Sequence, residues 1–163
     1  MKILIIALPR TGSTSFLKKI SKDRNLKSFF EPFDGTGRVI YNNEDNSVVK
    51  TIISHHQNNL ELINNFDEII LLNRRNLKEL IESHSYQTYF LKTGYNSNNP
   101  YVYKEPPQEI INLCTSDILN WNEEINHLSE ITKIPITYYE DIFDNNSPDR
   151  LRVPINKLIY KLI

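Results

Sequence analysis

The residues best suited to chemistry lie between Pro9 and Phe16, directly after an apolar run at residues 3–8. The length and branched side chains of this run predict a buried strand. The sequence from Phe16 onward has the pattern of an amphipathic helix, and Gly12 permits a sharp turn before it. A strand, a tight loop and a helix start in this order leave backbone amides without intrahelical partners. These amides and the helix dipole attract an anion.

Side chains of the same segment add donors to this predicted anion site. Arg10 carries a fixed positive charge that can bind two oxygens of one anion. Hydroxyl groups come from Thr11, Ser13, Thr14 and Ser15. We therefore expect the loop to bind a phosphate or a sulfate, whereas the alternative interpretation is an ordinary strand-to-helix turn.

The segment differs from the phosphate-binding loop of ATPases and GTPases. That Walker A loop has glycine where this chain has Ala7, and lysine where it has Ser13. The predicted strand at 68–72 is followed by Asn73, whereas P-loop NTPases place there an aspartate that helps to hold magnesium. We expect a nucleotide whose leaving anion needs no metal, and we expect no metal site.

Four sequence elements resemble those of sulfotransferases that use 3′-phosphoadenosine 5′-phosphosulfate (PAPS). Residues 9–15 resemble the 5′-phosphosulfate loop, and Arg75 with Ser83 have the spacing of the 3′-phosphate element, a strand-end arginine with a serine eight positions later. Residues 29–33 resemble the Glu-Pro segment of carbohydrate and bacterial sulfotransferases, and residues 138–142 resemble a late Tyr-Glu-Asp strand end. The elements follow the family order over most of the chain, which is therefore similar to a small PAPS-dependent sulfotransferase.

This resemblance implies roles for individual residues. Arg10 and the loop after it would hold the 5′-phosphosulfate, and Arg75 with Ser83 would hold the 3′-phosphate. Glu31 would take the proton of an acceptor hydroxyl. Lys50 matches the lysine of a Lys-Thr-His segment in cytosolic members and would place positive charge on the sulfuryl group; a strand lysine that faces water is the equal alternative.

The identity of the base stays open at this stage. Cytosolic sulfotransferases use a histidine two residues after that lysine, where this chain has Ile52. His55 and His56 come later and are the competing bases, although such histidines are more often simply exposed. We favour Glu31, because a glutamate is ionised at neutral pH and can accept the proton.

Two further assignments also have alternatives. Arg74 and Arg75 are neighbours in an extended segment and point to opposite faces, so at most one of them reaches the phosphate. The glycine-rich loop that closes over the 3′-phosphate in cytosolic members is missing, and Arg150 or Arg152 is the candidate replacement. Residues 93–100 form either a loop that binds the acceptor or a plain surface connection.

Bulk properties narrow the class of protein. A chain of 163 residues predicts a single domain over residues 1–163, and a net charge of -1 gives no reason to expect nucleic acid as a partner. Cys114 is the only cysteine, which excludes an intrachain disulfide and fits a reducing, cytoplasmic location. We interpret the first eight residues as a strand instead of a secretion signal, and expect no membrane span. Abundant asparagine, isoleucine and lysine indicate an AT-rich microbial or viral genome.

Apolar runs alternate with helical patterns along the chain. Strands are predicted at 2–8, 38–41, 47–53, 68–72 and 135–139, with a further short strand at 28–30. Helices are predicted at 13–21, 56–65, 76–91 and 107–132, the last one broken near 115–117. This alternation predicts a three-layer α/β fold of the P-loop NTPase type with a mostly parallel central sheet. Arg10, Glu31, Arg75 and Glu140 each follow an apolar run, so they should gather at one edge of the sheet.

The sequence thus favours transfer of a sulfuryl group from PAPS to a hydroxyl of a sugar, lipid or small metabolite. A P-loop nucleoside or nucleotide kinase is one alternative, which Ala7, Ser13 and Asn73 disfavour. A degenerate protein that binds a nucleotide without catalysis is the other. The sequence does not define the acceptor or the oligomeric state.

Overall fold

The computed structural model describes residues 1–55, 58–92 and 105–143. Within these ranges five strands form one sheet in which every pair is parallel. The strands are β1 (Lys2–Ala7), β2 (Lys27–Phe30), β3 (Ser47–Ile52), β4 (Glu68–Asn73) and β5 (Ile136–Tyr138). Their spatial order is β2-β3-β1-β4-β5, so the first strand lies at the centre of the sheet.

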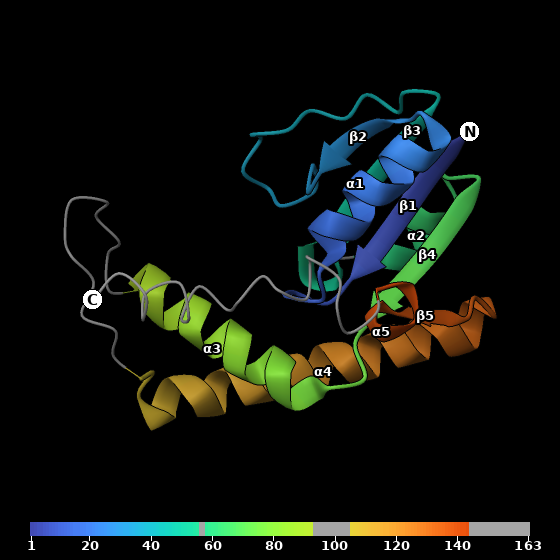
Figure 1. Ribbon diagram of the computed structural model, residues 1–163. Coiled ribbons are helices and arrows are strands. Elements are labelled where there is room, and N and C mark those ends of the chain that lie inside the picture. Colours follow the sequence, from blue (N-terminus) through green and yellow to red (C-terminus); the bar gives the residue numbers. More distant parts are fainter. Residues whose placement is uncertain (56–57, 93–104, 144–163) are drawn as a thin grey trace.

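Helices cover both faces of this sheet, which confirms a three-layer α/β arrangement (Figure 1). They are α1 (Ser13–Arg24), α2 (Asn59–Ile63), α3 (Leu77–Lys92), α4 (Gln108–Thr132) and α5 (Tyr139–Ile142), together with the 3₁₀ helix η1 (Ile53–His55). α1 and α5 pack on one face, and α2, α3 and α4 pack on the other. None of the described helices has both the length and the apolar character needed to cross a membrane.

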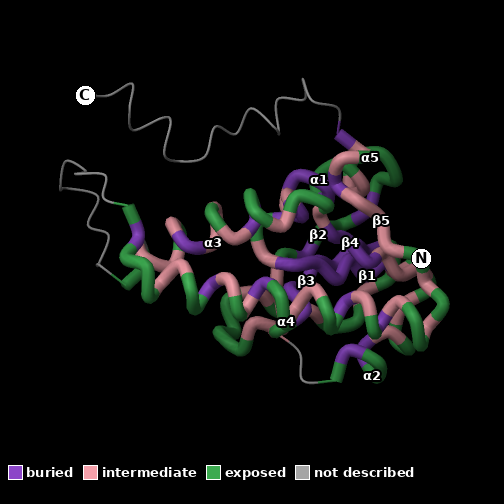
Figure 2. The backbone as a smooth tube through the Cα atoms, turned by 90° about the horizontal axis from the view of Figure 1, so that it is seen from below, coloured by how far each residue is buried: buried purple, intermediate pink, exposed green. Residues whose placement is uncertain are grey.

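β1 shows why the sheet is buried on both faces. Leu4 and Ile6 face the core cluster under α3 and α4, whereas Ile3 and Ile5 face the cluster under α1 and α5. All four side chains are fully buried, and β1 and its neighbour β3 are buried along almost their whole length (Figure 2). A strand covered on both sides needs apolar residues at successive positions, which explains the continuous apolar run.

The predicted strand at 38–41 is wrong, because these residues form part of the loop between β2 and β3. Val39 and Tyr41 pack on the core without strand pairing, whereas Ile40 is exposed. The Tyr41 ring meets the edge of Phe29 at a centroid distance of 5.0 Å and stacks on Phe66 at 5.8 Å. Burial of aromatic side chains by a loop therefore produced the apolar pattern that suggested a strand.

Two helices and one strand also differ in extent from the prediction. α4 is continuous, and the Thr115 hydroxyl donates to the Ile111 carbonyl at 2.7 Å, so the polar residues near 115–117 do not interrupt the helix. The helix predicted at 56–65 is shorter, because the Asn58 side chain caps α2 by accepting from the Glu61 amide at 3.2 Å. The last strand ends at Tyr138, where α5 takes over. The short strand at 28–30 is confirmed within β2.

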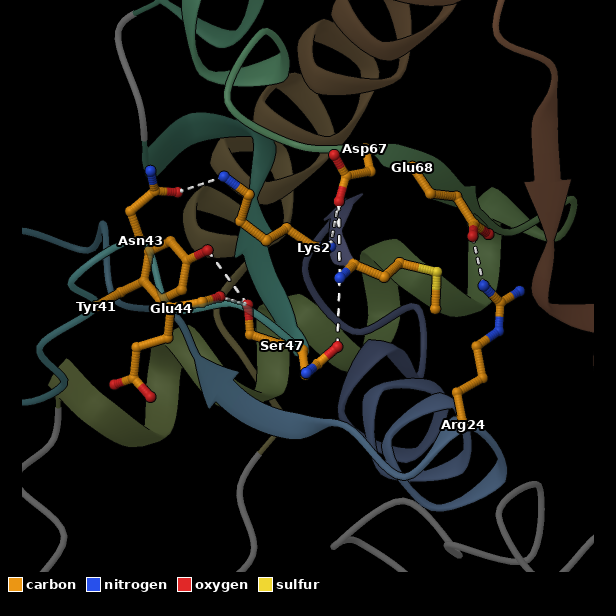
Figure 3. A network of polar contacts seen from close by, with 10 residues as sticks. Lys2, Arg24, Tyr41, Asn43, Glu44, Ser47, Asp67 and Glu68 are labelled. Atoms are coloured by element: carbon orange, nitrogen blue, oxygen red, sulfur yellow. Dashed lines mark hydrogen bonds and ion pairs between the residues drawn. The ribbon is translucent and has the colours of Figure 1, made fainter.

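Polar contacts hold the strands together at their amino ends (Figure 3). The Lys2 amide donates to Asp67 at 2.7 Å, and the Lys2 ammonium donates to Asn43 at 3.2 Å. The Tyr41 hydroxyl and the Ser47 hydroxyl lie 3.2 Å apart. These contacts fix β1 relative to its two neighbours, at the end of the sheet opposite the predicted site.

Candidate functional site

The candidate site lies at the carboxyl ends of β1 and β3. The connection after β1 leads to β2 on one side of the sheet, whereas the connection after β3 leads to β4 on the other side. Neighbouring strands whose connections diverge in this way form a topological switch point, where open α/β sheets bind their ligands. Residues 8–12 follow β1 at this point, and η1 follows β3.

The loop after β1 and the first turn of α1 place no acidic side chain at the start of this helix. Gly12 is the N-cap residue with φ of 77°, and as a glycine it has no side chain with which to cap the helix. The positive end of the helix dipole is therefore not neutralised by a carboxylate of this turn. This arrangement agrees with the predicted anion loop.

The four residues predicted to donate hydroxyl groups differ in how far they are buried. Thr11 is buried, and its hydroxyl donates to the Leu8 carbonyl at 2.8 Å, so its proton holds the loop and is not free for a ligand. Ser13 and Ser15 are also buried, whereas Thr14 is half-buried. Thr11 is thus a residue that shapes the loop.

Arg10 connects this loop to α3. Its Nε donates to the Ser83 hydroxyl oxygen at 2.9 Å, across 73 positions of sequence. Arg10 has φ of 65°, a left-handed backbone conformation that is uncommon for residues other than glycine. The structure therefore brings together one residue predicted for the 5′-phosphosulfate and one predicted for the 3′-phosphate.

Glu31, Lys50 and His55 form a second group beside the loop. Lys50 is almost fully buried and forms an ion pair with Oε1 of Glu31. Nδ1 of His55 lies 3.9 Å from Oε2 of the same carboxylate. The Glu31 amide donates to the Lys50 carbonyl at 2.8 Å, which places the glutamate at the end of β2. Lys50 does not face water, so that alternative interpretation is wrong.

Electrostatics link this group to Arg10. Burial lowers the pKa of Lys50 below its ordinary value, the ion pair with Glu31 opposes this effect, and the charge of Arg10 lowers the pKa further. The Lys50 ammonium also lies 4.1 Å from the centre of the Phe30 ring. Two cations and one carboxylate leave this part of the site with a net positive charge beside the start of α1, which favours an anion.

Arg74 and Arg75 have different partners, as expected for neighbours in an extended segment. Arg75 forms two hydrogen bonds with Asp141, at 2.6 and 2.7 Å, and its guanidinium lies 4.4 Å from the centre of the Tyr138 ring. Arg74 pairs with Glu79 and lies near Glu140. Ser83 accepts a hydrogen bond from Arg10 and not from Arg75. The two residues predicted to hold the 3′-phosphate, Arg75 and Ser83, therefore have separate partners.

Two residues of this region were given no role in the sequence analysis. Asp141 belongs to the Tyr-Glu-Asp element, but the amino-acid sequence does not show that Asp141 pairs with Arg75. Tyr139 lies against Gly12: a Cβ added to this glycine would have Cδ2 of Tyr139 only 2.7 Å away. The only feature of the sequence that pointed to these two residues was the resemblance of residues 138–142 to the late Tyr-Glu-Asp strand end of sulfotransferases. His56, residues 93–100, Arg150 and Arg152 lie outside the described residues.

Comparison of the chain with protein-family models, with curated protein sequences and with solved structures finds no match. Among the residues that the structure describes, no three His, Cys, Asp or Glu side chains gather into a group that could hold a metal ion.

Proposed function

We propose that the chain is a PAPS-dependent sulfotransferase with a P-loop NTPase-like fold. The observation that carries the proposal is the hydrogen bond between Arg10 and Ser83. The resemblance assigned these two residues to opposite ends of one nucleotide, and the fold brings them into contact although they are far apart in the sequence. Their contact lies beside the switch point, where a nucleotide is expected.

The residues around the loop fit the 5′-phosphosulfate of PAPS. The N-cap residue Gly12 has no side chain that could occupy the start of α1, the first turn contains no acidic residue, and Arg10 is exposed at the same turn. The positive charge of Arg10 and Lys50 exceeds the negative charge of Glu31. When bound, PAPS supplies an activated sulfuryl group whose departure from the nucleotide needs no metal.

The chain's own residues supply the proton acceptor and the positive charge. Glu31 is held by Lys50 through one oxygen, and its other oxygen faces His55. An acceptor hydroxyl can therefore transfer its proton to Glu31 directly, or to His55 with Glu31 as the group that orients the ring. Arg10 and Lys50 neutralise negative charge that develops on the transferred group.

Thermal unfolding with nucleotides tests this proposal. With EDTA present, 3′,5′-adenosine diphosphate should raise the melting temperature, since a ligand at about 100 times its Kd stabilises a protein by about 2.7 kcal/mol. Arg10→Ala should weaken binding by about ten- to a hundred-fold, because it removes hydrogen bonds to a charged group. Arg24→Ala, at the far end of α1, is the matched control and should bind normally.

The same measurement separates the alternatives. Strict dependence on magnesium with a preference for ATP would instead support a kinase. Turnover of labelled PAPS with pools of sugar, lipid and metabolite acceptors then distinguishes an enzyme from a protein that only binds the nucleotide. Binding of 3′,5′-adenosine diphosphate without transfer to any pool would contradict the enzymatic part of the proposal.

A further inference from the structure

Five charged side chains join the start of α3 and the segment before it to α5. This group, the arginine clasp, consists of Arg74, Arg75, Glu79, Glu140 and Asp141. Two guanidinium groups face three carboxylates, so the clasp has a net negative charge. A phosphate is repelled by such a cluster unless one of its carboxylates moves away.

Asp141 occupies the part of Arg75 that a phosphate would use. Nη1 and Nη2 of Arg75 donate to Oδ1 and Oδ2 of Asp141 at 2.6 and 2.7 Å. Arginine binds phosphate through the same parallel pair of N–H groups. A phosphate on the other edge of this guanidinium would lie close to the Asp141 carboxylate, and like charges at that distance repel.

The other two carboxylates of the clasp are less suited to exchange with a ligand of Arg75. Glu140 is only 18% exposed, accepts from the Arg75 amide at 3.2 Å and lies 3.5 Å from Nε of Arg74. Glu79 pairs with Arg74. Asp141 is 56% exposed and Arg75 is 53% exposed, so both are open to solvent. The hydrogen bonds from Arg75 lower the pKa of Asp141, which keeps the carboxylate ionised at neutral pH.

We infer that Asp141 competes with the 3′-phosphate of the nucleotide for Arg75 and thereby sets the affinity for 3′-phosphorylated nucleotides. The inference rests on the proposed function. Binding exchanges one anion for another on the same arginine, and Asp141 returns when 3′,5′-adenosine diphosphate leaves. Asp141 is thus a specificity-determining residue that lowers the affinity for the product and favours its release.

Calorimetry with 3′,5′-adenosine diphosphate and 5′-adenosine monophosphate tests the exchange. Asp141→Asn should bind the first nucleotide about two- to five-fold more tightly, the range expected from loss of an exposed ion pair. Its affinity for 5′-adenosine monophosphate should not change. In an Arg75→Ala background the same substitution should have no effect. Glu79→Gln is the matched control, because Glu79 is 52% exposed but pairs with Arg74, and it should produce a smaller change.

Each other outcome contradicts the inference in a different way. Weaker binding by Asp141→Asn would mean that Asp141 positions Arg75 for the phosphate. Equal tightening for both nucleotides would mean that Asp141 acts only through long-range charge. If Arg75→Ala weakens 3′,5′-adenosine diphosphate and Asp141→Asn changes nothing, the competition is wrong while the proposed function stands. If the wild-type protein binds neither nucleotide, the proposed function and the inference both fail.

Discussion

Replacing Gly12 with alanine tests how closely the anion loop packs against α5. Gly12 has φ of 77°, in the left-handed region, and the Tyr139 ring covers the position that a Cβ would take. Tyr139 is itself buried. An alanine at this position would therefore meet two obstacles, a backbone conformation that disfavours side chains and a ring that has to move.

The two obstacles have separate magnitudes. A left-handed conformation costs an L-residue about 1–2 kcal/mol. Displacement of a packed ring costs about 1–3 kcal/mol more, in line with overpacked cores. We expect Gly12→Ala to lower the free energy of unfolding by about 2–5 kcal/mol, a large part of the about 5–15 kcal/mol typical of a domain.

Gly35 provides the matched control, since it has φ of 76° and no atom within 4 Å of an added Cβ. Urea unfolding of Gly12→Ala and Gly35→Ala should give a difference of about 1–3 kcal/mol, which isolates the ring contact. Effects of alanine on the unfolded chain cancel between the two variants. In a Tyr139→Ala background, Gly12→Ala should cost no more than Gly35→Ala. Equal costs in the wild-type background, or strict additivity with Tyr139→Ala, would refute the packing that we describe.

Two further predictions concern the base and a half-buried histidine. Glu31→Gln keeps the shape of the side chain and removes a proton acceptor. Steady-state turnover of PAPS should therefore fall by about 10² to 10⁴, while the affinity for 3′,5′-adenosine diphosphate persists. Near-normal turnover of Glu31→Gln, together with an inactive His55→Ala, would assign the role of proton acceptor to the histidine. Burial lowers the pKa of His84, so the unfolded state takes up the proton at a higher pH than the folded state. The free energy of unfolding should therefore decrease as pH falls below about 6.5. In urea unfolding at pH 5.5, 6.5 and 7.5, His84→Gln should flatten this dependence. The same slope in His84→Gln as in the wild type would contradict this role of burial.

The predicted fold class followed from local patterns in the sequence. The apolar run before Pro9 is buried on both faces of the sheet, as its composition indicated, and α1 begins at Ser13, where the prediction placed the helix. Alternation of apolar runs with helical periodicity predicted a parallel sheet, which the structure confirms. Such features are set by residues within one or two turns of each other, so the sequence alone contains them.

The predicted boundaries of strands and helices were wrong where tertiary packing overrides the local preference of the sequence. The apolar residues at 38–41 lie in a loop because Tyr41 packs among aromatic rings, and α4 stays helical through Thr115 because its hydroxyl bonds within the helix. A short window of sequence does not distinguish an apolar residue that pairs in a sheet from one that covers its edge.

By itself the sequence determined which residue types follow the strands, and therefore the chemical character of the site: an arginine, hydroxyls and the start of a helix around Gly12. Only the tertiary structure decided which of these residues meet. The bond between Arg10 and Ser83, the group of Glu31 with Lys50, and the pairing of Asp141 with Arg75 each join separate elements of the fold. These contacts depend on strand order and on how helices dock against the sheet, which are fixed by the burial of the whole core and not by any one segment.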